Sequence, residues 1–154
     1  MSAQLNDLPH YRHMVERDLD AIMAIEKVIY PHPWTRGNFK DSLRENYHCP
    51  VIEFRGEIIG YCVMAVAAGE AHLLNLSVAY RWQRQGRGRD MLNYLLALAR
   101  DSGAAKMFLE VRPTNIAGVA LYAASGFTEI AIRRGYYPAS EGREDAIVMQ
   151  LELA

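Results

Sequence analysis

The amino-acid sequence predicts an α/β fold with a mixed, mostly antiparallel sheet that contains a locally parallel central pair and is flanked by helices. The prediction rests on two strand–helix–strand passages between residues 71 and 134, because such a crossover joins parallel strands. Short apolar segments separated by turn residues surround these passages, and they favour antiparallel strands. Ligands of such sheets bind at the carboxyl ends of strands, where the pattern splits.

The individual elements follow from apolar periodicity and from turn residues. Helices are expected at residues 16–30, 39–47 and 116–125, and a longer helix follows the polar turn at residues 83–88. The prolines at 31 and 33 end the first helix, and Gly103 and Gly126 are stop signals for the last two. Strands are expected at residues 10–15, 49–54, 58–67, 71–78, 104–111, 127–134 and 146–153, with a loop at 135–142.

The composition is that of an ordinary globular protein. The 154 residues, 51% hydrophobic and 23% charged, are expected to form one domain over residues 1–154. A net charge of −1 gives no global attraction to nucleic acid or to a membrane, and no apolar run approaches spanning length. The first residues lack the apolar stretch of a signal peptide, which favours a cytoplasmic protein with Cys49 and Cys62 reduced. The five histidines lack metal-binding spacing, so no metal is expected.

The turn after the central strand has the features of an anion site. The first N–H groups of a helix point out of its end, and they can bind a phosphate. Gly86 and Gly88 allow close approach to the backbone, while Arg84, Arg87 and Arg89 supply positive charge. The alternative is a tight turn with a solvated basic rim. Two common phosphate motifs are excluded, because no Lys-Ser or Lys-Thr follows and no third glycine completes G-x-G-x-x-G.

Three further residues could carry chemistry. Glu110 lies in a strand that reads as buried; it is either a carboxylate paired with an arginine or a general base whose pKa is raised by desolvation. Asn115 alone reads as a helix cap and Tyr122 as a half-buried helix aromatic. The two are seven residues apart and therefore share a helix face, and their occurrence together behind a phosphate turn favours function.

The motifs together resemble a known family. The segments LNLSVAYRWQRQGRGRDML, LEVRPTNIAGVALYAASGF and RRGYYP…EDAIVMQLEL are similar to RimI-type ribosomal-protein-alanine N-acetyltransferases of the GNAT superfamily, and the likeness covers most of the chain. The resemblance implies the GNAT fold, acetyl-coenzyme A (acetyl-CoA) as donor, and a ribosomal-protein N-terminus as acceptor. Gly118 departs from the alanine common at that place, and a glycine within a helix costs up to about 1 kcal/mol relative to alanine.

The resemblance also implies roles for particular residues. Leu76, Ser77 and Val78 offer backbone groups to the pantetheine arm of the donor. Glu110 is the base and Tyr122 the acid. The remaining implied cofactor contacts are Arg84, Gln85, Gly86, Arg87, Gly88, Arg89 and Asn115.

The acceptor is predicted from aromatic loops and from amine chemistry. Trp34, Tyr136 and Tyr137 are expected to hold a peptide, and Glu141, Glu144 and Asp145 to steer a basic one. Deprotonating an α-amine of pKa near 8 needs about 3.3 kcal/mol less work than deprotonating a lysine near 10.4, which favours a protein N-terminus. A lysine or small-amine acceptor is the second reading. A non-catalytic acyl-CoA-binding module is the third, and it is disfavoured because Glu110 and Tyr122 are both present.

Overall fold

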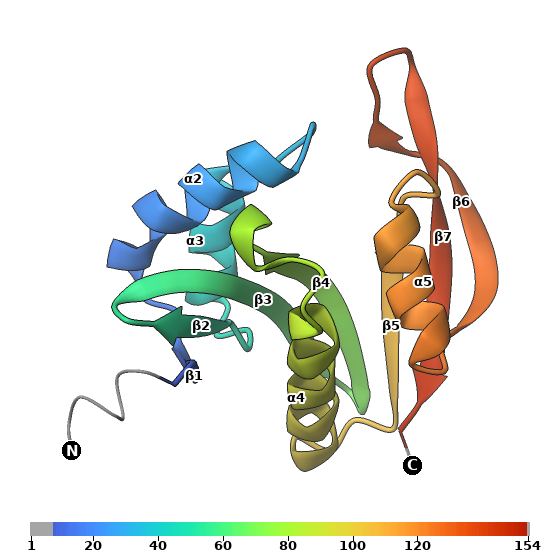
Figure 1. Ribbon diagram of the computed structural model, residues 1–154. Helices are drawn as coiled ribbons and strands as arrows, with labels where there is room; N and C mark the ends of the chain where they lie inside the picture. Colours follow the sequence, from blue (N-terminus) through green and yellow to red (C-terminus); the bar gives the residue numbers. More distant parts are fainter. Residues whose placement is uncertain (1–7, 154) are drawn as a thin grey trace. The chain divides into compact units, whose positions relative to one another are not determined.

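The structure, a computed structural model that describes residues 8–153, contains a seven-stranded mixed sheet of order β1-β2-β3-β4-β5-β7-β6 (Figure 1). The parallel pair is β4 with β5, as predicted. The strands are β1 His10–His13, β2 Pro50–Phe54, β3 Glu57–Ala67, β4 Glu70–Val78, β5 Lys106–Val111, β6 Thr128–Pro138 and β7 Arg143–Glu152. The helices are α2 Leu19–Ile29, α3 Arg36–Arg44, α4 Arg87–Asp101 and α5 Ile116–Ala124, with short 3₁₀ turns η1 Glu16–Asp18 and η2 Tyr80–Trp82.

Contacts between residues divide the described chain into two compact units. The first unit contains residues 8–64 and Asn75–Gly88, and the second contains Ala65–Leu74 and residues 89–153. Each unit has buried apolar side chains of its own, among them Leu19, Phe39 and Tyr61 in the first and Met91, Leu95 and Met107 in the second. That residues 1–154 form a single domain remains a prediction.

The second helix of the first unit begins three residues earlier than the sequence suggested. Thr35 caps α3, because its Oγ1 accepts a hydrogen bond from the Asn38 N–H (3.1 Å) and its own N–H donates to Asn38 Oδ1 (2.9 Å). Satisfying the exposed N–H groups of the first turn in this way sets where the helix starts. Residues 31–35 interrupt the helices, as the sequence predicted. Thr35, the last of them, is also the residue that starts α3.

An ion-pair cluster ties β1 to β2 and to the start of α2. The Arg12 guanidinium donates to both carboxylate oxygens of Asp18 (2.8 Å each) and to Glu53 Oε2 (2.5 Å). Asp18 also accepts from the Val15 N–H (2.8 Å). The hydrogen bonds from Arg12 hold the pKa of Asp18 below its usual range, although burial opposes them. The charged form of Asp18 therefore stabilises the fold.

The helix after the glycine turn has the buried face that the sequence predicted. Met91, Leu92, Leu95, Leu96 and Ala99 of α4 are buried. Gly103 and Gly126 follow α4 and α5 with φ of +85° and +98°, a region that glycine enters without steric cost. The glycine stop signals are therefore confirmed.

The last hairpin differs from the prediction. Residues 135–142 were expected to be a loop, but β6 continues to Pro138 and β7 begins at Arg143 (Figure 1). The strand register shifts between Arg133 and Tyr137, where Gly135 has a φ of +60°. This irregularity bends β6 without ending its pairing with β7, so a glycine that reads as a loop signal lies within a strand.

We expect Asp18→Asn to lower the free energy of unfolding at pH 7 by about 1.5–3 kcal/mol, because it weakens charged hydrogen bonds in a protected cluster. The stability from the lowered Asp18 pKa is present above the unfolded pKa of about 3.9 and is lost as pH falls through the folded value. In urea unfolding, parent and variant should therefore begin to converge as pH falls below about 4 and become equal once pH is below the folded pKa of Asp18. Asp20→Asn is the control, since Asp20 pairs with Arg36 in solvent and should change stability by less than about 1 kcal/mol.

Candidate active site

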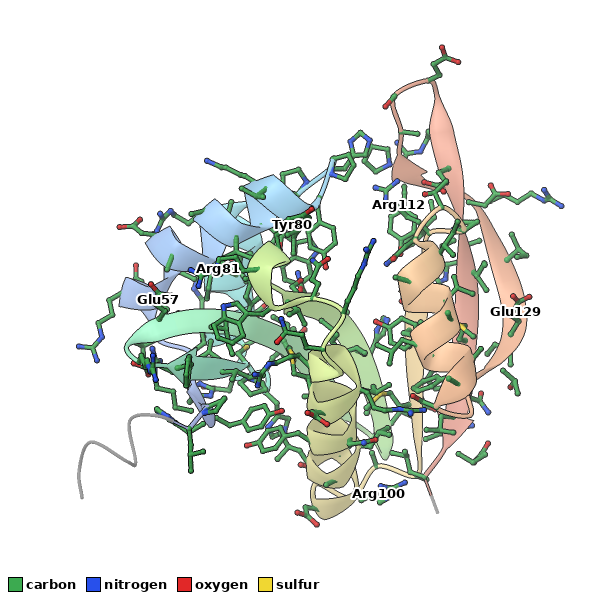
Figure 2. The ribbon with its side chains drawn as sticks, viewed as in Figure 1. Glu57, Tyr80, Arg81, Arg100, Arg112 and Glu129 are labelled. Atoms are coloured by element: carbon green, nitrogen blue, oxygen red, sulfur yellow. The ribbon has the colours of Figure 1, made fainter. Side chains whose placement is uncertain are left out.

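The predicted phosphate turn follows β4 and continues into the first residues of α4, which begins at Arg87. Residues 84–88 belong to the first unit and Arg89 to the second. The 3₁₀ turn η2, where Figure 2 labels Tyr80 and Arg81, follows β4 directly. Gln83 then reaches back, its Nε2 donating to the Val78 carbonyl (2.9 Å), and Gln85 Nε2 donates to the Arg81 carbonyl (3.2 Å). These two bonds hold the turn against the strand without using the N–H groups that open α4.

Two features of this turn suit an anion. Gly86 has a φ of +78°, and a Cβ added to it would meet no atom within 4 Å, so the backbone there is open to a ligand. The Arg87 guanidinium lies 5.1 Å from the centroid of the Trp82 ring, and its Nε is buried with no hydrogen-bond partner among the described residues. A buried donor without an acceptor is costly, and an anionic ligand would satisfy it.

A buried polar network lies behind the residues predicted to bind the pantetheine arm. Ser77 Oγ donates to Asn75 Oδ1 (2.6 Å) and shares a hydrogen bond with the Tyr30 hydroxyl (2.7 Å). The Tyr30 hydroxyl also lies 3.3 Å from the Leu76 carbonyl oxygen. The Ser77 side chain therefore faces the interior, and Leu76 alternates to the half-buried face of β4.

Glu26 of α2 is the centre of this network, and the sequence reading missed it. It is 1% exposed, and its Oε1 accepts from the Tyr61 hydroxyl (2.7 Å) and from Asn75 Nδ2 (3.4 Å). Burial raises the pKa of Glu26, while these hydrogen bonds act in the opposite direction. The helical spacing of the buried residues Leu19, Ile22 and Met23 continues to position 26, and this spacing could have predicted that Glu26 is buried.

Trp34, predicted to contact the acceptor, is tied to the same network through its backbone. Its N–H donates to Glu26 Oε2 (2.8 Å), and its ring packs on the buried Phe39 at a centroid distance of 5.0 Å. Trp34 is half-buried. The residue is therefore positioned by the interior of the first unit, and its contact with an acceptor remains a prediction.

Glu110 of the second unit lies in β5, on the half-buried face opposite the buried Met107 and Leu109. Its side chain is 9% exposed. His72 Nε2 lies 2.5 Å from Glu110 Oε2, and Arg133 Nε lies 3.7 Å from Oε1. Sequence reasoning missed His72 because the contact depends on the β4–β5 register, which places His72 opposite Phe108, two residues before Glu110.

The expected rise in the Glu110 pKa is wrong in direction. Burial does act to raise it, but the hydrogen bond from His72 and the charges of His72 and Arg133 outweigh burial and hold the pKa below its usual range. The carboxylate is therefore ionised at neutral pH. A desolvated carboxyl keeps a high pKa only when no strong donor or cation reaches it, and here the His72 ring and the Arg133 guanidinium both do.

Asn115 and Tyr122 lie on α5 as predicted, and the structure explains the unusual glycine between them. Asn115 is the N-cap residue, with Oδ1 accepting from the Gly118 N–H (3.0 Å). A Cβ at Gly118 would lie 2.5 Å from Asn115 Nδ2 and 2.8 Å from Cγ. Gly118 thus makes room for the capping side chain. Tyr122 is 8% exposed and packs edge-on against Phe127 at 5.7 Å.

The aromatic pair of the last hairpin lies close to Glu110 and its partner Arg133. Tyr136 and Tyr137 contact each other at 4.9 Å, and the Arg133 guanidinium lies 5.5 Å from the Tyr136 ring centroid. Burial raises the pKa of Tyr137, and the negative charge of Glu110 adds to this rise. Of the predicted residues, the structure therefore brings Tyr137 into the electrostatic field of Glu110.

The carboxylates expected to steer a basic peptide are engaged within the hairpin. Arg112, labelled in Figure 2, donates to Glu144 Oε1 (3.1 Å) and to the Pro138 carbonyl (2.7 Å). Glu144 Oε2 accepts from the Thr114 hydroxyl (2.7 Å), and Asp145 Oδ1 accepts from the Gly135 N–H (2.8 Å). Glu144 therefore fastens the end of β5 to the hairpin, and Asp145 joins the two strands of the hairpin. That these carboxylates also steer a basic peptide stays a prediction.

Features of other kinds of site are absent from the described chain. Among residues 8–153, no three histidine, cysteine or acidic side chains are grouped so that they could hold a metal ion. No helix of the described chain is long and apolar enough to cross a membrane. Cys49 and Cys62 are buried and free, and burial raises the pKa of the Cys49 thiol to about 11, so it is a poor nucleophile.

Comparisons with known proteins agree with this arrangement. The model of the acetyltransferase (GNAT) family matches residues 19–127. The ribosomal protein bS18-alanine N-acetyltransferase of Escherichia coli (strain K12) is 39% identical over 137 residues, which cover 89% of this chain and 93% of that protein.

Solved structures support the same relationship. The crystal structure of the ribosomal-protein-S18-alanine N-acetyltransferase from Escherichia coli matches with a TM-score of 0.88 and 36% identity, covering 96% of this chain and 95% of that one. A Salmonella typhimurium protein determined with its cofactor acetyl-CoA matches with a TM-score of 0.78 and 21% identity, covering 96% and 95%, which shows a shared fold. The chain belongs to the GNAT acetyltransferase family and, within it, to the RimI-type N-acetyltransferases.

Proposed function

We propose that this protein transfers the acetyl group of acetyl-CoA to the N-terminal alanine amine of a small-subunit ribosomal protein. The observation that carries the proposal is the 39% identity, over nearly the whole of both chains, to a relative named for that reaction. An acceptor of this kind implies a cytoplasmic enzyme, and it requires no direct contact with nucleic acid or a membrane and no metal.

Residues 76–89 supply most of the groups that fit acetyl-CoA. We assign the pyrophosphate to the turn of Arg84, Gln85, Gly86, Arg87, Gly88 and Arg89, where the buried Arg87 Nε has no acceptor within residues 8–153 and Gly86 leaves the backbone open. We assign the pantetheine arm to the backbone of Leu76, Ser77 and Val78. The pairing of β4 with β5 ends at Leu73, so these residues lie beyond the parallel ladder. Asn115 is assigned a cofactor contact in addition to its capping bond. When bound, acetyl-CoA supplies the activated acetyl thioester.

The second unit supplies the acid and base. We assign the base function to Glu110, acting directly or through water on the amine, and the acid function to Tyr122. A thiolate of pKa near 8.5 is a weaker base than a tyrosinate near 10, so proton donation by Tyr122 must accompany departure of the thiolate. The lowered pKa of Glu110 widens its gap to an amine near 8, which makes a lone carboxylate a weak base for this step.

The acceptor side of the proposal rests on aromatic contacts. Trp34, Tyr136 and Tyr137 are proposed to hold the first residues of a flexible N-terminus. Tyr136 is 43% exposed, so its ring can contact a ligand, while Trp34 and Tyr137 are held from behind by Phe39 and Arg112. Glu141 remains available for an acceptor cation. A lysine or small-amine acceptor is the second candidate, and a non-catalytic acyl-CoA-binding module the third.

The cofactor site can be tested at Gly86 with a matched glycine as control. Gly86 and Gly69 share a φ of +78° and empty space around an added Cβ, so valine should strain both backbones equally. We expect Gly86→Val to weaken acetyl-CoA binding at least about tenfold in calorimetry, and Gly69→Val to bind like the parent. Equal affinities for both variants and the parent would remove the turn from the cofactor site. Gly88→Val should behave like Gly86→Val.

The chemical roles predict a specific kinetic signature. Glu110→Gln and Tyr122→Phe change little volume but remove the capacity to transfer a proton. Each should lower kcat by about 10²–10⁴ while leaving acetyl-CoA affinity unchanged, measured by coenzyme A release and by calorimetry. Because Tyr122 packs against Phe127, a Tyr122→Phe variant with nearly full kcat would reassign this residue to packing.

The acceptor is tested with paired peptides. Peptides that begin with alanine should be acetylated on the α-amine, whereas the same peptides with a blocked α-amine and a free lysine should react at least about tenfold more slowly, since lysine is harder to deprotonate. Mass spectrometry locates the acetyl group. Equal rates for the two sets would make the protein a lysine acetyltransferase. Binding of acetyl-CoA without transfer to any amine would favour the non-catalytic module.

A further inference from the structure

The proposed base, Glu110, has a side-chain partner, His72, that carries no part of the proposed function. His72 of β4 and Glu110 of β5 extend from the half-buried faces of two neighbouring parallel strands, and Nε2 lies 2.5 Å from Oε2. The His72 side chain is 40% exposed and that of Glu110 only 9%. Within residues 8–153, the His72 ring makes its hydrogen bond with the carboxylate of Glu110.

We propose that His72 is a catalytic residue whose Nδ1 takes the proton from the acceptor amine, while Glu110 holds the ring through Nε2–H. The inference rests on the proposed function and refines it, because it names the atom that receives the proton. Glu110 then keeps an essential part in the base function, as the group that positions and stabilises the imidazole.

Hydrogen-bond chemistry assigns the two nitrogens. An ionised carboxylate only accepts hydrogen bonds, so the nitrogen facing it must carry a proton. In a neutral imidazole the other nitrogen then carries the lone pair. Here Nε2 faces Glu110, which leaves Nδ1 as the basic atom of the more exposed member of the pair.

The charges around the pair favour this division of work. Arg133 lies 3.7 Å from the second carboxylate oxygen, and the Tyr137 ring is within reach of the Glu110 charge. Against the effect of burial, the hydrogen bond from His72 and the charge of Arg133 hold the pKa of Glu110 below its usual range, so the carboxylate is ionised. A fixed carboxylate stabilises the imidazolium that forms on protonation, the arrangement known from serine-protease triads. An imidazole, whose unperturbed pKa is about 6.5, is also a stronger base than a carboxylate, whose unperturbed pKa is about 4.3.

The proton and bond changes balance over the reaction. The amine nitrogen bonds to the acetyl carbon and loses a proton to His72 Nδ1, the carbon–sulfur bond breaks, and the sulfur takes a proton from Tyr122. The imidazolium proton then returns through water to the tyrosinate. Both side chains end as they began, and the products are the acetylated amine and the free thiol.

His72→Gln separates proton acceptance from the positioning of Glu110. The Gln amide can donate to the carboxylate as Nε2 does, but it cannot take a proton. We expect kcat to fall by about 10²–10⁴ with acetyl-CoA affinity kept. In His72→Ala, added imidazole should restore part of the rate. His10→Gln is the control, since His10 also lies near a glutamate, 3.8 Å from Glu53, and its rate should not change. A His72→Gln enzyme within about threefold of the parent, or no imidazole rescue, overturns the proposal.

A readout that needs no acceptor distinguishes this inference from the proposed function. Imidazole ¹⁵N chemical shifts report which nitrogen carries the proton in the neutral ring. We expect the Nε2–H form at His72 in the parent and a loss of that preference in Glu110→Gln. An Nδ1–H form in the parent overturns the His72 proposal whatever the activity. Failure of the parent to acetylate any amine counts against the proposed function. The His72 tautomer still tests, independently of activity, whether Glu110 holds the ring through Nε2–H.

Discussion

The parallel pairing of β4 with β5 is the constraint on which the proposed chemistry depends. It joins Glu70–Leu73 to Lys106–Leu109, and strand alternation then puts His72 and Glu110 on the same face. Ala71, Leu73, Met107 and Leu109 occupy the opposite, buried face. A slip of one residue would exchange the two faces and turn the carboxylate into the apolar core. The apolar face therefore fixes the register, and the register fixes the distance between imidazole and carboxylate.

Two carboxylates of this protein show how surroundings decide the properties of one side-chain type. Among residues 8–153, the hydrogen-bond donors to Glu26 are neutral, namely a tyrosine hydroxyl, a side-chain amide and a backbone N–H. Burial therefore dominates and raises the pKa of Glu26. Glu110 makes a hydrogen bond with His72 and an ion pair with Arg133, so its pKa is lowered despite burial. The first carboxyl joins α2, the Trp34 backbone, β3 and β4 into one network. The second is an ionised group suited to orienting a base.

The charged residues Arg112 and Glu144 of the second unit stabilise its structure. Arg112 lies between the Tyr137 ring, at 4.3 Å from its centroid, and the Glu144 carboxylate, so one guanidinium holds both the aromatic and the acid. Glu144 in turn accepts from Thr114 at the turn that leads into α5. Asn115 caps the same helix one residue later, in space left by Gly118. A short stretch after β5 is therefore restrained on both sides, which keeps α5 and its Tyr122 in a defined orientation relative to the hairpin.

The sequence by itself determined the order of the elements, the glycine stops, the apolar face of α4 and the glycine turn, because these depend on residues close together in the chain. It also placed Glu110 in its strand and Asn115 at the helix cap, since apolar patterning and capping are local rules. Strand order, the register of β4 against β5 and the continuation of β6 past Gly135 depend on residues far apart in the chain. Only the tertiary structure could therefore pair His72 with Glu110, bury Glu26 among Tyr61 and Asn75, and reverse the expected pKa shift, because a pKa depends on which charges a fold brings within a few ångströms.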